Sequence, residues 1–385
     1  MNSEDAEHPK SGISETFLYL DVFAFQMLAG VTSLAVPIYA NMLRASPFLV
    51  GIIGSTGGLI YSFMPLISGM LSDRFGRKRF VYLSLLSFGL SCILYSLTKD
   101  SIILIMVRGL ESLSAAIFWP SVEALIADLH SERLEETLRK FNISWSLAML
   151  LGPLIGGMLI ERFSILSPFI FSTVLSIPLG ILSLIFIMEQ KKEHERASFN
   201  MMLKREMRSA NLAFASIILF STTVGIITCL FPYHATDLNF PPYEIGFITF
   251  SFGAARVLTF LKATRIEAKI GKNGMFLLGS LSLATASLIT SQASTPQSFT
   301  FCFIVYGFGA GLSYAASISS LFRLWSQSKA YAAGIFESLI GLGYVIGPLI
   351  GGTLSESARN APYLFSFTLS FLVLLLQTAL CKRSE

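Results

Sequence analysis

Residues 141–160 read FNISWSLAMLLGPLIGGMLI, a run of twenty residues without a charged side chain. Because a helix rises about 1.5 Å per residue, about 20 residues match the ~30 Å hydrocarbon core of a bilayer. The rest of the chain shares this character, since 53% of its 385 residues are hydrophobic and only 14% are charged. Soluble domains carry about 25% charged residues. The sequence therefore predicts an integral membrane protein.

Apolar blocks of similar length recur along the chain and predict twelve membrane spans. These spans lie at residues 17–40, 48–70, 80–97, 101–128, 141–162, 165–188, 209–234, 243–262, 275–291, 298–322, 331–355 and 362–381. The longest polar stretch, 189–208, predicts a cytoplasmic linker between two six-helix bundles, 17–188 and 209–381. It suits either a helix on the membrane surface or a solvated tether. Polar tails remain at 1–16 and 382–385, and the first lacks the features of a signal peptide.

The distribution of basic residues predicts how the chain is oriented. With both termini in the cytoplasm, 22 Lys and Arg residues fall in cytoplasmic segments, four in outer segments and two inside spans. This bias is the one that sets membrane topology, and it also supports an even number of spans. The net charge of +4 is small and gives no reason to expect a nucleic-acid partner. The four Cys and four His residues are scattered, so no metal site is predicted.

Two copies of GPLIGG, starting at Gly152 and Gly347, indicate an internal repeat. They lie 195 residues apart, each in the fifth span of its half. Repeated spans in the same order predict two bundles that run the same way through the membrane. Small residues allow close helix packing and proline bends a helix. The predicted packing and hinge residues are Gly152, Pro153, Gly156, Gly157, Gly343, Gly347, Pro348, Gly351 and Gly352.

The junction of the second and third spans, residues 69–80, reads GMLSDRFGRKRF. Gly76 permits a tight turn, Gly69 would let helices approach, and the basic residues would face the anionic inner leaflet. The ordered pattern resembles motif A of the major facilitator superfamily, a family of membrane transporters. The matching residues are Gly69, Leu71, Asp73, Arg74, Gly76, Arg77 and Arg79.

The resemblance covers the whole chain and implies an all-α fold of twelve transmembrane helices. It also implies that Asp73 and Arg77 belong to a conformational gate, with Asp128 or Glu123 as the acidic partner. The stretch around Arg108 is similar to motif B of the family, which is linked to proton coupling. The GPLIGG segments resemble motif C, which is associated with antiporters. A packing hinge alone is an equally good interpretation of those segments.

Five charged residues inside spans are candidates for proton or substrate binding, because a charge in the membrane must face protein or water. Arg108 and Glu111 are spaced i, i+3 and are expected to pair on one helix face. Asp21 lies near the start of its span, where water could reach it. Arg256 and Glu337 complete the set. Each is also compatible with a purely structural role.

These features favour a secondary transporter that works by alternating access. The leading hypothesis is proton-coupled export of small amphipathic organic compounds. The alternative is uptake of a sugar, organic acid or other nutrient by symport or facilitated diffusion. The sequence offers no clustered residues for an enzyme. The expected partners are a small-molecule substrate and membrane lipids, with the proton gradient as energy source, no cofactor, and a monomer in a prokaryotic cell membrane.

Overall fold

The structure is a computed structural model that describes residues 4–129, 134–189, 207–325 and 329–382. The described part is helical and contains no strand, which confirms the all-α prediction. Its elements are α1 (Glu4–Met42), α2 (Pro47–Phe75), α3 (Arg77–Leu97), α4 (Ile103–Leu129), α5 (Leu134–Arg162), α6 (Ser167–Phe186), α7 (Met207–Asp237), α8 (Pro242–Thr290), α9 (Pro296–Leu324), α10 (Lys329–Ser355) and α11 (Ala361–Lys382).

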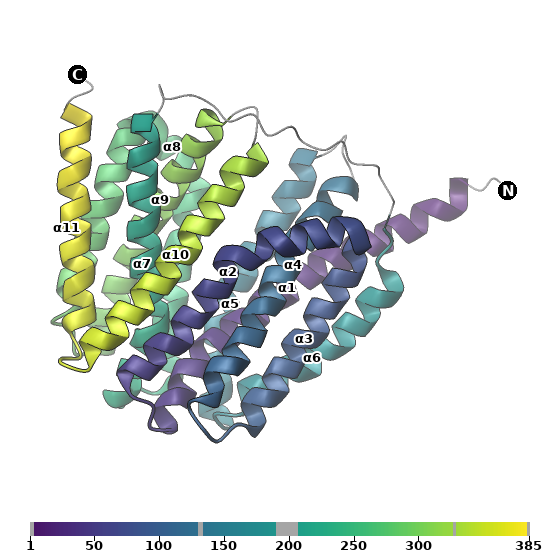
Figure 1. Ribbon diagram of the computed structural model, residues 1–385, viewed down its shortest axis with the longest axis horizontal. Coiled ribbons are helices and arrows are strands. Elements are labelled where there is room, and N and C mark those ends of the chain that lie inside the picture. The colour runs from purple at the N-terminus through teal and green to yellow at the C-terminus, as the bar shows by residue number, and fades with distance from the viewer. Residues whose placement is uncertain (1–3, 130–133, 190–206, 326–328, 383–385) are drawn as a thin grey trace.

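The helices form two groups that stand side by side. Helices α1–α6 make one half and α7–α11 the other, on the right and left of Figure 1. All eleven of these helices are long and apolar enough to cross a membrane. We call the end where α6 finishes and α7 begins the linker end. The opposite end carries the turns at 43–46, 163–166, 238–241 and 356–360.

Helix α8 folds back on itself at Gly271, whose backbone is left-handed (φ 69°, ψ 173°). A Cβ added at Gly307 of α9 would overlap the Phe252 carbonyl oxygen, and one added at Gly309 would lie 2.9 Å from the Gly279 carbonyl oxygen. A straight helix would separate residues 252 and 279 by about 40 Å. Both nevertheless contact α9 at positions two residues apart. The two arms of α8 therefore lie beside the same level of α9.

The backbone turns repeat with the same spacing as the two GPLIGG segments. Four described residues have positive φ, and they form two pairs. Arg44 and Asn239 both have φ 58°, while Gly76 and Gly271 have φ 104° and 69°. The members of each pair are 195 residues apart. The break in α8 is therefore the repeat equivalent of the turn that separates α2 from α3.

Local sequence explains where several helices begin. The Ser46 side chain caps α2 by accepting a hydrogen bond from the Leu49 N–H, and Pro47 occupies the first helical position. Thr295 and Ser298 form a capping box at the start of α9. These residue types satisfy the free N–H groups of a first turn. At the N-terminus the prediction of a separate polar tail differs from the structure, in which α1 already begins at Glu4. Hydropathy could not show this, since helix propensity extends beyond the apolar window.

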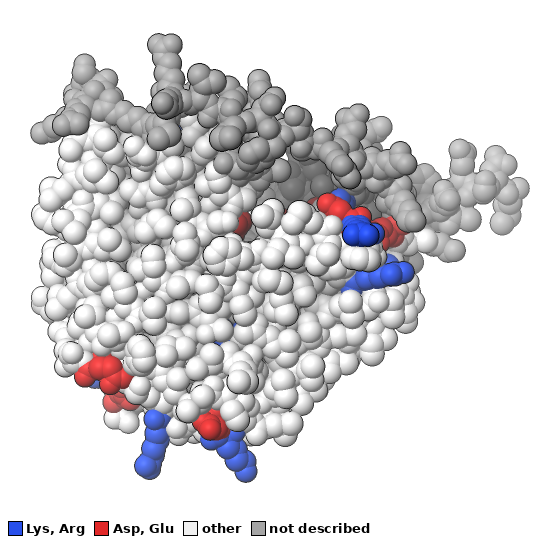
Figure 2. Space-filling view, in the orientation of Figure 1, with Lys and Arg blue, Asp and Glu red and all other residues white. Residues whose placement is uncertain are grey.

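The two halves have aromatic cores and apolar exteriors. Phe25 stacks on Phe118 with ring centroids 4.1 Å apart in the first half, and Phe231 packs on Phe303 at 4.4 Å in the second. Outward-facing side chains include Met106, which is 78% exposed. In Figure 2 most of the described charges on the visible face gather at the two ends, and the band between them is largely uncharged. This pattern suits a surface covered by lipid.

Candidate functional site

A buried charge network lies inside the first half. The predicted Arg108–Glu111 pair is confirmed, with Nη1 and Oε2 2.7 Å apart. The Glu111 carboxylate also accepts hydrogen bonds from the Tyr95 hydroxyl at 2.8 Å and the Thr32 hydroxyl at 2.6 Å. Glu111 is 4% exposed. One carboxylate thus connects α1, α3 and α4, and no sequence motif points to Tyr95 or Thr32 as its partners.

Asp21 lies elsewhere in the same half. It is fully buried, so the expectation that water reaches it is wrong for this conformation. Its carboxylate oxygens accept hydrogen bonds from Ser183 of α6 at 2.9 and 2.8 Å. The neighbouring α6 covers the start of the span, and a hydropathy plot cannot report that packing. Asp21 therefore joins α1 to α6 and stays apart from Glu111.

The seam between the two halves brings together Glu123 of α4 and Glu337 of α10. The two carboxylates lie within electrostatic range of each other, and Arg256 of α8 lies within range of Glu337. Tyr61 and Tyr314 are within range of both carboxylates. In the part of the chain that the structure describes, no ion pair involves either acid. Glu123, a predicted partner of the gate, lies instead at this seam, within range of Glu337.

Arg256 lies over two aromatic rings. Its guanidinium lies 5.2 Å from the Tyr314 ring centroid and 5.4 Å from that of Phe260. The residue is 8% exposed, and its Nε has no hydrogen-bond partner. Stacking on aromatic faces partly compensates a buried guanidinium. Together with Glu123 and Glu337 it gives the seam two acids and one base from both halves.

Two contacts define the described part of the motif A turn. Arg77 Nη2 lies 2.7 Å from Asp73 Oδ1, and the backbone N–H of Arg77 donates to the Glu189 carboxylate at 2.7 Å. Glu189, which the sequence analysis assigned to the linker, thus caps the start of α3. The side chain of the proposed partner Asp128 lies outside the described residues.

Two glycines of motif A behave differently. Gly76 has the positive φ that a tight turn requires. A Cβ added at Gly69 would meet Pro120 at 3.6 Å, which is an ordinary contact. The idea that Gly69 is needed for close helix approach is therefore wrong. Arg74 lies over the ring of its neighbour Phe75 at 5.4 Å.

Glycines of the two GPLIGG segments make close helix contacts, as predicted. Gly152 and Gly156 lie against α1, and Gly343, Gly347 and Gly351 lie against α7. A Cβ at Gly152 would be 2.7 Å from the Gly30 Cα atom. The remaining pair, Gly157 and Gly352, contacts the other half of the molecule. Each GPLIGG helix therefore packs both on its own half and across the seam.

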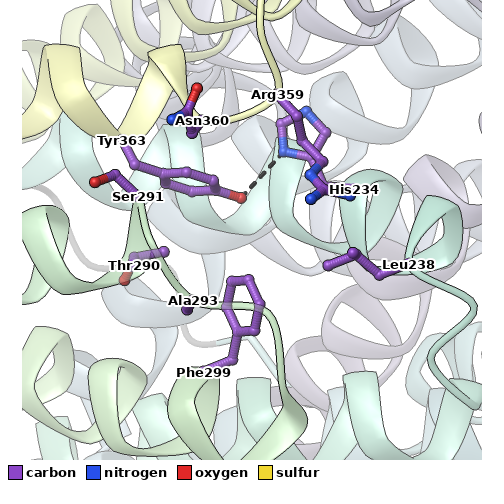
Figure 3. A pocket seen from close by; sticks show the side chains of 9 residues that line it. All are labelled: His234, Leu238, Thr290, Ser291, Ala293, Phe299, Arg359, Asn360 and Tyr363. Atoms are coloured by element: carbon purple, nitrogen blue, oxygen red, sulfur yellow. Dashed lines mark hydrogen bonds between the residues drawn. The ribbon is translucent and has the colours of Figure 1, made fainter.

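A small cavity of about 30 Å³ lies at the opposite end of the second half (Figure 3). The buried His234 ring borders it and is hydrogen-bonded on both nitrogens, to Tyr363 at 3.1 Å and Ser355 at 3.0 Å. A water molecule needs at least about 10–15 Å³ of such volume, so the cavity has room for one or two waters. Across the described residues, no three His, Cys, Asp or Glu side chains gather to hold a metal ion.

Known proteins resemble this chain over most of its length. The Major Facilitator Superfamily model matches residues 18–214 and 212–384. Multidrug resistance protein 1 of Bacillus subtilis is 27% identical over 371 residues, which cover 93% of each chain. Quinolone resistance protein NorA of Staphylococcus aureus is 23% identical over 357 residues, 90% of each chain.

The fold also matches solved structures. The crystal structure of the nucleoside transporter NupG superimposes with a TM-score of 0.78 at 14% identity, covering 96% of this chain and 99% of that one. These relatives are transporters rather than enzymes. The two family matches overlap at residues 212–214, in the first turns of α7, and together span nearly all of the chain. The chain therefore belongs to the Major Facilitator Superfamily.

Proposed function

We propose that this protein is a proton-coupled exporter of small amphipathic organic compounds in the cell membrane. Similarity to a multidrug resistance protein and to a quinolone resistance protein supports export. The proton gradient would supply the energy, without a cofactor. The protein would work as a monomer whose two halves open alternately to each side.

The observation that carries this proposal is that Glu123 of one half and Glu337 of the other lie within electrostatic range of each other. Charged groups at membrane depth are unfavourable unless another group compensates them. A proton or a positively charged compound could each compensate these carboxylates, and the nearby Tyr61 and Tyr314 rings could hold an organic cation by cation–π contact. Because both would compete for the same carboxylates, proton entry would favour release of the compound. That competition is the basis of antiport.

The topology that we propose has twelve spans with both termini in the cytoplasm. The two arms of α8 supply two of these spans, since Gly271 corresponds to the turn between α2 and α3. The linker end would be cytoplasmic, in agreement with the excess of Lys and Arg in the segments there. Most of the described hydrogen bonds between the halves lie towards the opposite end, for example from Asn41 to Asp237 at 2.7 Å, and the one nearest the linker end joins Ser338 to the Ser62 carbonyl at 3.5 Å. The seam would then be open to the cytoplasm in this conformation.

Reconstitution into proteoliposomes tests the proposal. A fluorescent amphipathic cation should be transported when a pH gradient is imposed, and transport should fall to the gradient-free rate in the Glu123→Gln/Glu337→Gln double variant. Glu244→Gln is the matched control, because it removes an acid from the opposite end, away from Glu123 and Glu337. Equal transport rates of the native protein with and without the pH gradient would contradict proton coupling.

Arg256 favours a second candidate function, the uptake of an anionic nutrient. Its buried Nε has no partner and could donate a hydrogen bond to a carboxylate. A counterflow assay with organic acids separates the two functions. Exchange of an organic acid that is lost in Arg256→Gln would favour uptake over export.

A further inference from the structure

The two halves meet at the opposite end through two contacts that are copies of each other. In the first, α10 lies against the start of α2. A Cβ added at Gly352 would lie 2.6 Å from the Pro47 carbonyl oxygen, and one at Gly51 would overlap the Pro348 carbonyl oxygen. Backbone therefore touches backbone, with no room for a side chain between the helices.

The second contact joins α5 to the start of α8 in the same way. A Cβ at Gly246 would lie 2.6 Å from the Pro153 carbonyl oxygen, and one at Gly157 would overlap the Pro242 carbonyl oxygen. Each residue here is 195 positions from its counterpart in the first contact, in one direction or the other. The repeat thus builds the same seam twice, around a pseudo-twofold axis.

An exposed carboxylate closes the edge of each contact. Glu356 Oε1 accepts a hydrogen bond from the Phe48 N–H of α2 at 3.0 Å. Glu161 Oε2 accepts one from the Tyr243 N–H of α8 at 2.8 Å. These glutamates are also 195 residues apart, and each follows its own GPLIGG segment.

The chemistry of a helix start explains why a carboxylate binds there. Pro47 and Pro242 occupy the first helical position and have no N–H, so the next residue offers the first free donor. The positive end of the helix dipole adds to the attraction for an anion. In both cases the carboxylate belongs to the other half of the molecule, so the hydrogen bond cannot survive separation of the halves.

We propose that Glu161 and Glu356 are two clasps that hold the opposite end closed and that must both release when the transporter opens there. This inference rests on alternating access but not on the identity of the transported compound. The glycines set how closely the helices approach, and the clasps stabilise the closed state relative to the open one.

The two clasps bind helix starts that are capped differently, so we expect their loss to have effects of different size. Helix α2 has a second cap, because Ser46 accepts a hydrogen bond from the Leu49 N–H. The residue before α8 is Pro241, which provides no side-chain hydrogen bond. Loss of Glu161 therefore leaves its helix start less satisfied than loss of Glu356 does. Glu161→Ala should favour opening more than Glu356→Ala.

Distance measurement between spin labels tests the clasps without a transport assay. Labels at Lys99→Cys and Gln292→Cys mark exposed turns of the two halves at the opposite end. Cys381→Ser removes the native cysteine that is not buried. We expect each single clasp variant to raise the open-to-closed ratio about fivefold or more, as the loss of one hydrogen bond implies, and the double variant to raise it about 25-fold.

Glu244→Gln is the matched control, because it removes a carboxylate from the same first turn of α8 that Glu161 contacts. Its open-to-closed ratio should stay within twofold of that of the native protein. An unchanged distance distribution in the double alanine variant would overturn the proposal. If the double variant does not fold, the two single variants decide it: absence of an effect in both would reject the clasps, and equal effects would reject the predicted difference between them. The labels report conformation and not transport. The test of the clasps therefore stays valid even if the protein proves not to be a proton-coupled exporter.

Discussion

Replacing Glu111 by Gln tests whether the buried network stabilises the first half. Glu111 receives hydrogen bonds from Arg108, Tyr95 and Thr32 at 2.7, 2.8 and 2.6 Å. Removing one partner of a buried ion pair costs about 3–5 kcal/mol, because the other charge is left uncompensated. Two features reduce this figure. The Arg108 side chain is 25% exposed, and the Gln amide oxygen can still accept a hydrogen bond. We expect a loss of about 2–3 kcal/mol in the free energy of unfolding.

Equilibrium unfolding of the purified protein, followed by tryptophan fluorescence, measures this loss. A double-mutant cycle with Arg108→Gln isolates the pair, since removing both charges leaves neither uncompensated. The coupling between the two substitutions should be about 1–2 kcal/mol, so that the double variant is less destabilised than the sum of the single ones. Glu244→Gln controls for loss of one acid elsewhere. A coupling below ~0.5 kcal/mol would refute the idea that Arg108 and Glu111 stabilise the fold as a pair.

Three further changes probe the seam and the gate. Glu337→Gln should remove the acceleration of export by a pH gradient, measured as the ratio of rates with and without it, and an unaltered ratio would shift the proton site away from Glu337. Gly352→Val should lower transport about tenfold because its side chain would press on a backbone oxygen 2.6 Å away, whereas Gly334→Val, with nothing within 4 Å, should transport normally. Asp73→Asn should change stability by less than ~1 kcal/mol, since Asp73 is 55% exposed, and thermal unfolding would reveal any larger effect.

Features that are local in sequence could be predicted well. The apolar blocks gave the membrane class and the helical fold because each span satisfies its own backbone hydrogen bonds. The i, i+3 spacing of Arg108 and Glu111 gave their pairing, since helix geometry fixes which side chains meet. The repeat of GPLIGG gave the division into two halves. In each case the information lay within one helix or in a comparison of two similar segments.

Contacts between helices could not be predicted, because they depend on how separate spans are packed. Tyr95 and Thr32 join Glu111 from two other helices, and neither stands in a distinctive motif. Glu123 was assigned to the gate from its position near the end of a span, but the rotation of α4 places it within range of Glu337. Glu189 is the first residue of the predicted polar linker, yet its carboxylate accepts a hydrogen bond from a backbone N–H at the start of α3.

The seam contains close backbone contacts at glycines and hydrogen bonds of exposed carboxylates. We expect these two kinds of contact to have different roles in alternating access. Gly157 and Gly352 each pack closely against the backbone of a helix in the other half. Such packing requires a close fit between the two helices, so it would be lost as soon as the halves tilt apart. The carboxylates of Glu161 and Glu356 are exposed on the edge of the same contacts, where solvent could replace each broken hydrogen bond. A broken clasp therefore leaves no buried polar group unsatisfied, which keeps the open state within a few kcal/mol of the closed one. Binding of a proton or a compound at the seam could then shift the balance, because ligands move an equilibrium only by their differential affinity for its two states.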